Sequence, residues 1–259
     1  MRVVAHIDTE AHPITDPAFS DRCKAILDER GALVLEGFFR PAAIEQIISD
    51  VMLQRDDVFY AASTHNVYLT LPSDQFADDH AFNRQVVSSK GLIADDQIPP
   101  DSPLREVYES PEFRAFLCAV IGVDAIYPYA DSLSSINVHF ADAGRELGWH
   151  FDNSAFAVTM LLQKPEGGGR FEYVADVRDA DAGEMGFERV AAALDGTAVT
   201  ATLDFEPGAL VLFRGRNALH RVTPTVGDTT RLLTVFAFNE KPDVQLSNSA
   251  LRTFFGRTS

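Results

Sequence analysis

Cysteine, tryptophan and long apolar runs are scarce in this sequence of 259 residues. It has two cysteines and one tryptophan, and no apolar stretch is long enough to span a bilayer. Cys23 and Cys118 lie far apart among apolar neighbours, so we expect buried free thiols rather than a disulfide or a metal pair. The first residues lack a basic start followed by an apolar run, so no signal peptide is predicted. These absences favour a cytoplasmic protein without a membrane partner.

Basic residues are also few, because 22 Lys and Arg stand against 38 Asp and Glu, a formal net charge of -16. Nucleic acid is therefore an unlikely partner, since proteins bind it largely by neutralising phosphates with basic side chains. The acidic balance is compatible with a cationic or zwitterionic small substrate, although ordinary solubility is the simpler explanation. Linkers, repeats and blocks of like charge are absent, so residues 1–259 are predicted to form a single domain, and nothing in the pattern indicates an oligomeric state.

The first 124 residues are predicted to supply supporting helices and loops. Residues 32–39 have the apolar character of a buried strand, and residues 55–100 contain few periodic stretches, which is typical of long loops over a core. Gly31 and Gly122 end helical patterns. Four helices are expected to start at residue pairs that end in proline: Asp16-Pro17, Arg40-Pro41, Ser102-Pro103 and Ser110-Pro111.

From residue 125 to 240 the pattern changes to short alternating or apolar runs separated by turn residues. One helical insertion is predicted at residues 183–196, and residues 241–259 form a C-terminal segment. The fold class that follows is mainly β with flanking helices, an α+β arrangement around a cupin-like jelly roll.

A possible metal site lies in the segment Trp149-His150-Phe151-Asp152. Strand alternation places His150 and Asp152 on one face, roughly 6 to 7 Å apart along the backbone. His220 comes 70 residues later, after a buried-strand pattern at 208–213, and only the fold could bring it to the same point. Two imidazoles and one carboxylate with open positions beside them are the ligands of non-haem iron(II) enzymes.

Arg231 provides a cation that a cosubstrate with two carboxylates needs beyond the metal. If Gly227-Asp228 forms a two-residue turn, residues 224 and 231 face each other across a hairpin, and Arg231 shares the inward face with His220. Their separation is then about 13 Å. The alternative is a surface arginine that caps an edge strand.

Other residues are weaker candidates. Thr223 is expected either to hydrogen-bond the cosubstrate or to cap the strand end. His80 and Arg84 lie in the loop-rich region, where Arg84 could bind the carboxylate of a zwitterionic substrate, and Asn153 could line the pocket although alternation points it away from the metal. Packing or structural hydrogen bonding is the simpler role for three further residues: Trp149, Asn137 and His139.

The stretch Gly148 to Phe238 resembles the 2-oxoglutarate-dependent oxygenases, which share a double-stranded β-helix core and a His-x-Asp...His triad followed by an arginine. Arg231 lies 11 positions after His220. The resemblance implies that His150, Asp152 and His220 hold Fe(II), that Arg231 pairs with the distal carboxylate of 2-oxoglutarate, and that dioxygen takes the last position. More narrowly, GWHFDNSAFAVTMLLQKPEGGGRFEYV and ALVLFRGRNALHRVTPTVGDTTRL are similar to radical halogenases of free amino acids and their hydroxylating relatives.

The halogenases of that branch have a small residue where this chain has Asp152, which leaves a coordination site for chloride. The carboxylate therefore favours hydroxylation of an unactivated C–H bond in a free amino acid or similar small polar metabolite, with decarboxylation of 2-oxoglutarate to succinate. Desaturation, cyclisation or epimerisation at the same iron centre is the alternative, and so is a non-catalytic cupin-like metal-binding protein.

Overall fold

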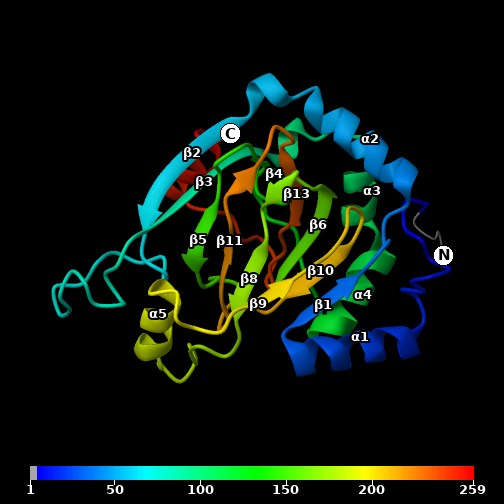
Figure 1. Cartoon of the computed structure of the whole chain (residues 1–259). Coiled ribbons are helices and arrows are strands. Elements are labelled where there is room, and N and C mark those ends of the chain that lie inside the picture. Colours follow the sequence, from blue (N-terminus) through cyan, green and yellow to red (C-terminus); the bar gives the residue numbers. More distant parts are fainter. Residues whose placement is uncertain (1–4) are drawn as a thin grey trace.

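The structure, a computed structural model that describes residues 5–259, is built around one curled antiparallel sheet (Figure 1). Two four-stranded groups form the halves of a jelly roll, as predicted. The strand of residues 86–93, from the predicted supporting region, joins the two halves. The strands follow one another in space in the order β1 (Ala32–Leu35), β10 (Leu210–Phe213), β6 (Ala157–Gln163), β13 (Arg231–Phe236), β4 (Ile136–Ala141), β3 (Val86–Ile93), β5 (Leu147–His150), β11 (Leu219–Val222), β8 (Phe171–Val174) and β9 (Ala201–Leu203). Outside this path, β2 (Phe59–His65) pairs with β3, and β7 (Gly167–Gly168) pairs with β12 (Thr225–Val226).

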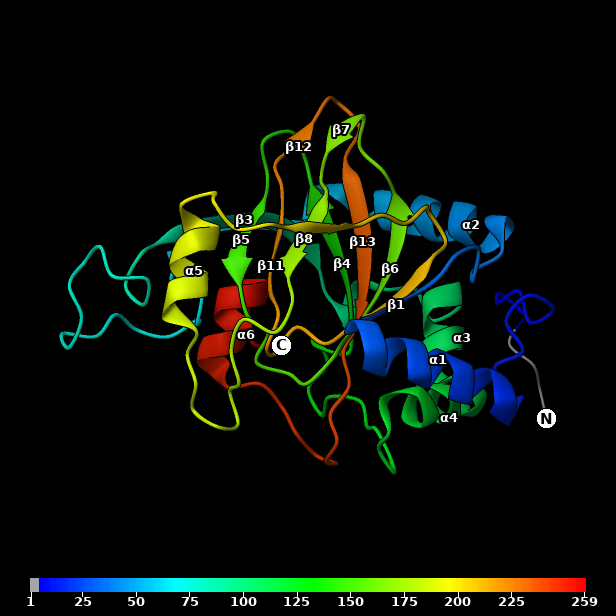
Figure 2. The ribbon, with the colours of Figure 1, turned by 60° about the horizontal axis from the view of Figure 1, so that its bottom comes forward.

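The helices cover two sides of the sheet. Four of them gather on one side: α1 (Pro17–Arg30), α2 (Pro41–Met52), α3 (Pro103–Glu109) and α4 (Pro111–Ile121). The predicted insertion contains α5 (Phe187–Leu194), which lies with the loop 66–85 on the opposite side in both ribbon views (Figures 1 and 2), and α6 (Asn248–Phe255) contacts β2 and β3. Single 3-10 turns occur at Arg55–Asp57 and Asp95–Gln97. None of the helices in residues 5–259 combines the length and apolarity needed to cross a membrane.

The predicted helix signals are confirmed. The Asp16 side chain accepts a hydrogen bond from the Ala18 N–H at the start of α1, and Gly31 ends that helix with a φ of 69°. The serine hydroxyls of residues 102 and 110 cap α3 and α4 in the same way. Both cysteines are free thiols, as expected, but only Cys23 is fully buried, and Cys118 is half-buried. Burial raises the pKa of Cys23 to about 11.

The prediction of long loops over residues 55–100 is wrong in part, because this region contributes β2 and β3. The seven residues of β2 pair with β3, which in turn pairs with both β4 and β5. These strands carry many small polar side chains and β2 is largely exposed, so the apolar alternation that reveals a half-buried strand is weak. The strand predicted at 32–39 is also shorter than expected, because Gly37 turns the chain with a φ of 63° after Leu35.

Two hydrophobic clusters organise the molecule. The larger one fills the space between the sheet and helices α1 to α4, and Phe236 of β13 lies in it against the rings of Phe39, Tyr108 and Phe113. The smaller one, which we call the cover cluster, joins the loop 66–85 and α5 to the ends of β5, β8 and β11. Its buried members include Tyr68, Trp149, Phe151, Val177, Val190 and Leu219.

Replacing Phe236 with alanine should destabilise the fold strongly. The side chain is 1% exposed, so Phe236→Ala leaves a cavity among three aromatic rings and should cost about 3 to 5 kcal/mol in the free energy of unfolding. Urea denaturation followed by circular dichroism measures this cost. Val199→Ala is the control, because Val199 is 93% exposed and its loss should change stability by less than about 0.5 kcal/mol.

Candidate metal centre

The structure brings the three predicted metal ligands together where β5 meets β11. His150 ends β5, and the antiparallel register pairs it directly with His220 of β11. Asp152 follows two residues after β5, where its backbone N–H donates to the Gly215 carbonyl at 3.1 Å. The Asp152 Oδ1 atom lies 3.5 Å from His220 Nε2 and 3.9 Å from His150 Nε2. One ligand atom from each residue therefore falls within 4.8 Å of the other two, close enough to share one ion.

Backbone hydrogen bonds orient both imidazoles. The Nδ1 atom of His150 lies 2.8 Å from the Gly148 carbonyl oxygen, and Nδ1 of His220 lies 3.0 Å from the Ala218 carbonyl oxygen. A carbonyl oxygen only accepts hydrogen bonds, so each Nδ1 must carry the proton. The Nε2 lone pairs are then free to bind a metal, which is how such hydrogen bonds fix the tautomer of metal-binding histidines.

The charges also suit a divalent cation. Burial, together with the nearby His220, lowers the pKa of His150 to about 3, so its ring is neutral at physiological pH. Burial alone would raise the pKa of Asp152, but the hydrogen bond and charge of His220, with His150 and Lys90, hold it below its ordinary value. Metal binding requires neutral imidazole and ionised carboxylate, and both are present.

The triad is closed on one side and open on the other. The ring of His220 packs against the rings of Phe171 and Phe213, which also contact each other, and the His220 side chain is only 6% exposed. The side chains of His150 and Asp152 are 17% and 22% exposed. An ion held here would therefore keep coordination positions for other ligands, as non-haem iron(II) sites do.

Two cations lie in the barrel interior: Arg231 is buried, and Lys90 is partly buried. The Arg231 side chain, at the start of β13, makes no ion pair or hydrogen bond with any described residue, and burial lowers its pKa to about 10. On β3, Lys90 Nζ lies 3.2 Å from Nε2 of His139 on β4. No carboxylate among residues 5–259 lies within ion-pair distance of Lys90. Burial lowers the Lys90 pKa to about 8, against the opposing charge of Asp152. Unpaired buried charges are costly, so this interior favours an anionic ligand.

The hairpin predicted to bring Arg231 to the inward face is wrong. β13 pairs with β4 and β6, and β12 pairs with β7, so β11 and β13 are not neighbours. The turn at Gly227-Asp228 is instead bound to Glu166, whose carboxylate accepts hydrogen bonds from the Asp228 N–H and the Thr229 hydroxyl. Arg231 nevertheless lies in the interior, where it is 5% exposed. Burial, together with the charges of Lys90 and Arg231, lowers the pKa of the His139 ring.

The weaker sequence candidates lie around this centre rather than in it. The Thr223 hydroxyl accepts the Arg170 N–H at 3.0 Å, which fits strand capping. His80 stacks on Phe76 and accepts the Phe82 N–H, and the Arg84 guanidinium pairs with Asp195 at 2.7 Å. The Asn153 side chain is exposed, and its backbone carbonyl accepts from Arg216.

Three residues set aside as structural have different outcomes. Asn137 donates to the Leu133 and Ser134 carbonyls, and Trp149 packs in the cover cluster, as expected. His139, in contrast, contacts Lys90 at 3.2 Å, and the charges of Lys90 and Arg231 both act on its ring. Lys90 was missed altogether, and the only signal for it was a lone charge inside the strand VVSSKGLI.

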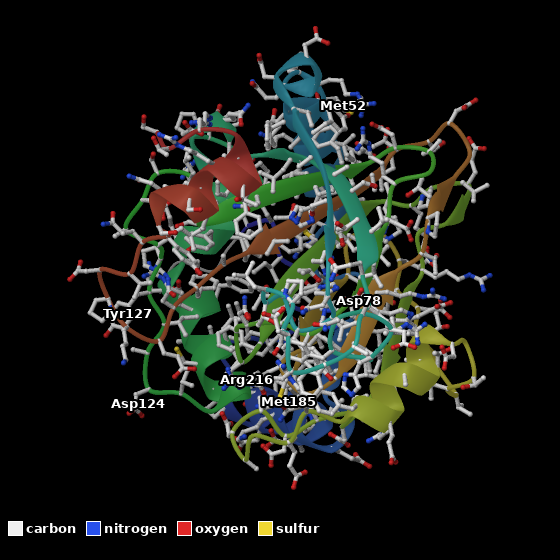
Figure 3. All side chains as sticks on the ribbon, turned by 90° about the vertical axis from the view of Figure 1, so that its left-hand side faces the viewer. Met52, Asp78, Asp124, Tyr127, Met185 and Arg216 are labelled. Atoms are coloured by element: carbon white, nitrogen blue, oxygen red, sulfur yellow. The ribbon has the colours of Figure 1, made fainter. Side chains whose placement is uncertain are left out.

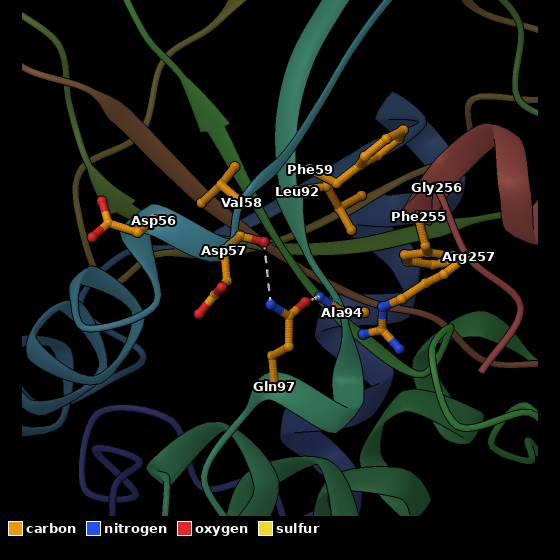
Figure 4. Close-up of a pocket in the computed structure, with 10 residues that line it drawn as sticks. All are labelled: Asp56, Asp57, Val58, Phe59, Leu92, Ala94, Gln97, Phe255, Gly256 and Arg257. Carbon is orange, nitrogen blue, oxygen red and sulfur yellow. Dashed lines mark hydrogen bonds between the residues drawn. The ribbon is translucent and has the colours of Figure 1, made fainter.

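A surface pocket of about 290 Å³ lies apart from the triad (Figure 4). It is lined by Asp57, Phe59, Leu92, Phe255 and Arg257, among others, between the β2–β3 pair and the end of α6. Arg257 pairs with Asp96 at its edge, and Gln97 donates to the Asp57 carbonyl across it. It contains none of the candidate site residues.

Solved structures support the fold. The chain is similar to the non-heme alpha ketoglutarate dependent epimerase SnoN from nogalamycin biosynthesis, with 14% identity, coverage of 85% of this chain and 80% of that one, and a TM-score of 0.58. The carbocyclase SnoK from the same biosynthesis has 12% identity, coverage of 84% and 82%, and a TM-score of 0.57. A 2OG-Fe(II) oxygenase family oxidoreductase from Burkholderia pseudomallei has 12% identity, coverage of 87% and 93%, and a TM-score of 0.53.

A sequence search of curated proteins gave no match. The family model described as Halogenase D, however, matches residues 85–253, a stretch that includes the triad, Lys90 and Arg231. The donor set fits Fe(II), and the buried, unpaired Arg231 fits the distal carboxylate of 2-oxoglutarate. The chain therefore belongs to the Halogenase D family, and it has the fold of the Fe(II)- and 2-oxoglutarate-dependent oxygenases.

Proposed function

We propose that this chain hydroxylates an unactivated C–H bond of a free amino acid or a similar small polar metabolite. The observation that carries the proposal is the His150, Asp152 and His220 triad, which opens toward a barrel interior that contains the buried, unpaired Arg231 and the partly buried Lys90. In the reaction, dioxygen gives one oxygen atom to the substrate as hydroxyl and the other to 2-oxoglutarate, which leaves as succinate and carbon dioxide.

The residues divide this task between them. The triad would hold Fe(II), which supplies the redox chemistry once 2-oxoglutarate is bound. Arg231 would bind the distal carboxylate of 2-oxoglutarate, preferably through two parallel hydrogen bonds, and Lys90 adds a second positive charge to the same interior. The aromatic wall at His220 and the cover cluster exclude water from one side.

The Asp152 carboxylate supports hydroxylation over halogen transfer. It occupies the position that a halide would need, and two features of the chain keep it there. Its N–H is bound to the Gly215 carbonyl, and Gly215 has no side chain in the space that the carboxylate occupies. A Cβ built on Gly215 would lie 1.9 Å from Asp152 Oδ2 and 2.9 Å from His220 Cε1.

Other outcomes at the same centre are a second candidate, because similar structures include an epimerase and a carbocyclase. The placement of the substrate radical decides among hydroxylation, ring closure, desaturation and inversion. These outcomes differ in product mass, since hydroxylation adds an oxygen, ring closure or desaturation removes two hydrogens, and epimerisation changes nothing.

Anaerobic addition of Fe(II) and 2-oxoglutarate tests the proposed cofactors. A visible charge-transfer band of the chelated 2-oxo acid is expected for the unmodified chain, and His150→Ala should lose it because one Nε2 ligand is gone. His6→Ala, which removes an imidazole that is paired with Glu106, should keep the band. A featureless spectrum from the unmodified chain would refute the oxygenase function.

Turnover with mixtures of free amino acids in high chloride tests the reaction type. Mass spectrometry should show a product that has gained one oxygen and no chlorine, with one succinate released per product. Chlorinated product from the unmodified chain would contradict the role given to Asp152, and a loss of two hydrogens would favour the second candidate.

Gly215→Ala should weaken metal binding without unfolding the chain. The new methyl group displaces the Asp152 carboxylate, so affinity for Fe(II) or Co(II) should fall about 10- to 100-fold, as when a metal ligand loses its support. Anaerobic titration measures the affinity, and thermal denaturation checks the fold. Gly167→Ala is the matched control, since a Cβ there makes an ordinary contact of 3.4 Å with Val226; equal metal affinity in both variants would argue against this role of Gly215.

A further inference from the structure

Arg178 lies at the start of the long segment between β8 and β9, close to the metal centre. Its backbone N–H and that of Val177 both donate to the Asn217 carbonyl, and the Asn217 side chain accepts the Ala180 N–H. Asn217 lies between Gly215, which binds Asp152, and the ligand His220. The backbone of Arg178 is therefore fixed to the chain segment that shapes the triad.

The guanidinium of Arg178 is oriented but not neutralised. Its Nε donates to the Arg216 carbonyl at 2.8 Å, and its Cζ lies 4.1 Å from the centre of the Phe151 ring, between the two ligands His150 and Asp152 in sequence. The ring of Tyr68 lies on the same side, with its centre 5.9 Å from Cζ. Neither terminal nitrogen of the Arg178 guanidinium has a hydrogen-bond acceptor among residues 5–259. The two terminal nitrogens are therefore held in place and remain available to donate hydrogen bonds to a ligand.

The charges around Arg178 leave it without a partner of its own. Arg216, labelled in Figure 3 on the face that carries the loop 66–85, is paired with Asp181 at 2.7 Å. Burial and the charge of Arg216 lower the Arg178 pKa, and the one carboxylate that opposes them is Asp152. A metal ion held by the triad would take Asp152 as a ligand, which leaves the half-buried Arg178 guanidinium without a counter-charge among residues 5–259.

We propose that Arg178 is a specificity-determining residue that binds a carboxylate of the substrate at the rim of the metal centre. The inference rests on the proposed function and names the group by which this site selects its substrate. A planar guanidinium stacked on an aromatic ring presents two parallel N–H donors, which match the two oxygens of a carboxylate. Because stacking and the Arg216 carbonyl already hold the fork, little conformational freedom is lost on binding.

This assignment replaces Arg84, the arginine that the sequence favoured for the same task. Arg84 is paired with Asp195 near the end of α5, so its charge is already neutralised. Arg178 has the same charge without a partner, and Asp152 acts on it. The substrate class that follows is a small carboxylic acid, of which a free amino acid is one kind.

Steady-state kinetics with matched pairs of substrates tests the proposal. Succinate release is measured for a panel of free amino acids and their carboxamides, with the unmodified chain, Arg178→Gln and Arg178→Lys. For the best acid, Arg178→Gln should raise KM about 10- to 100-fold with a smaller change in kcat, which is the loss of a charged hydrogen-bonded pair. Its carboxamide should keep its KM, so the preference for acid over amide disappears, and Arg178→Lys should lie between.

The control is Arg221→Gln. Arg221 also stacks on an aromatic ring, that of Trp149 at 4.7 Å, but its guanidinium is paired with Glu172 at 2.7 Å. This variant should keep the preference for acid over amide, and all variants should bind 2-oxoglutarate equally in the charge-transfer titration. An unchanged acid preference in Arg178→Gln, with the titration intact, would overturn the role of Arg178 alone. Absence of the band and of succinate release in the unmodified chain would overturn the proposed function.

Discussion

The pairing of His150 with His220 across β5 and β11 is the constraint on which the metal centre depends. Side chains alternate between the faces of a strand, so a slip of one residue would turn His220 to the outer face. The register shifts just beyond this pair, where Val222 faces Leu147, and such bulges commonly lie next to active sites because they redirect side chains. Each histidine also donates a hydrogen bond from Nδ1 to a backbone carbonyl oxygen. These bonds fix the ring orientations, so that the Nε2 lone pairs of both residues are free to bind the metal.

The barrel interior shows how a fold can be prepared for a ligand at a cost to its own stability. Arg231 is buried and Lys90 is partly buried, neither has a carboxylate partner among residues 5–259, and each unpaired charge opposes folding. Asp152 offsets only part of this charge and is committed to the metal. A dianion that binds the folded chain alone compensates both cations and stabilises the fold by mass action. The same positive charges that oppose folding would therefore favour the binding of 2-oxoglutarate in the proposed enzyme.

Local signals predicted much of the fold, while pairings between distant strands escaped prediction. The helix starts at proline and the shared face of His150 and Asp152 depend on neighbours in sequence, and the structure has them as predicted. The hairpin predicted for Arg231 is wrong because Asp228 of the turn donates a hydrogen bond to Glu166, which lies 62 residues away in the chain. β3 and its Lys90 were missed because the strand is completed by β4 and β5, and its own polar sequence carries little alternation.

The choice between two arginines shows where reading a sequence for function reaches its limit. Arg84 and Arg178 both lie in irregular segments, and the residue type alone gives each the same capacity to bind a carboxylate. Asp195 neutralises the first, whereas Arg216 and Phe151 orient the second without neutralising it. Both outcomes depend on contacts between loops and distant elements, which no local pattern specifies. A substrate carboxylate is recognised by the charge that the fold leaves unpaired, and that property appears only in three dimensions.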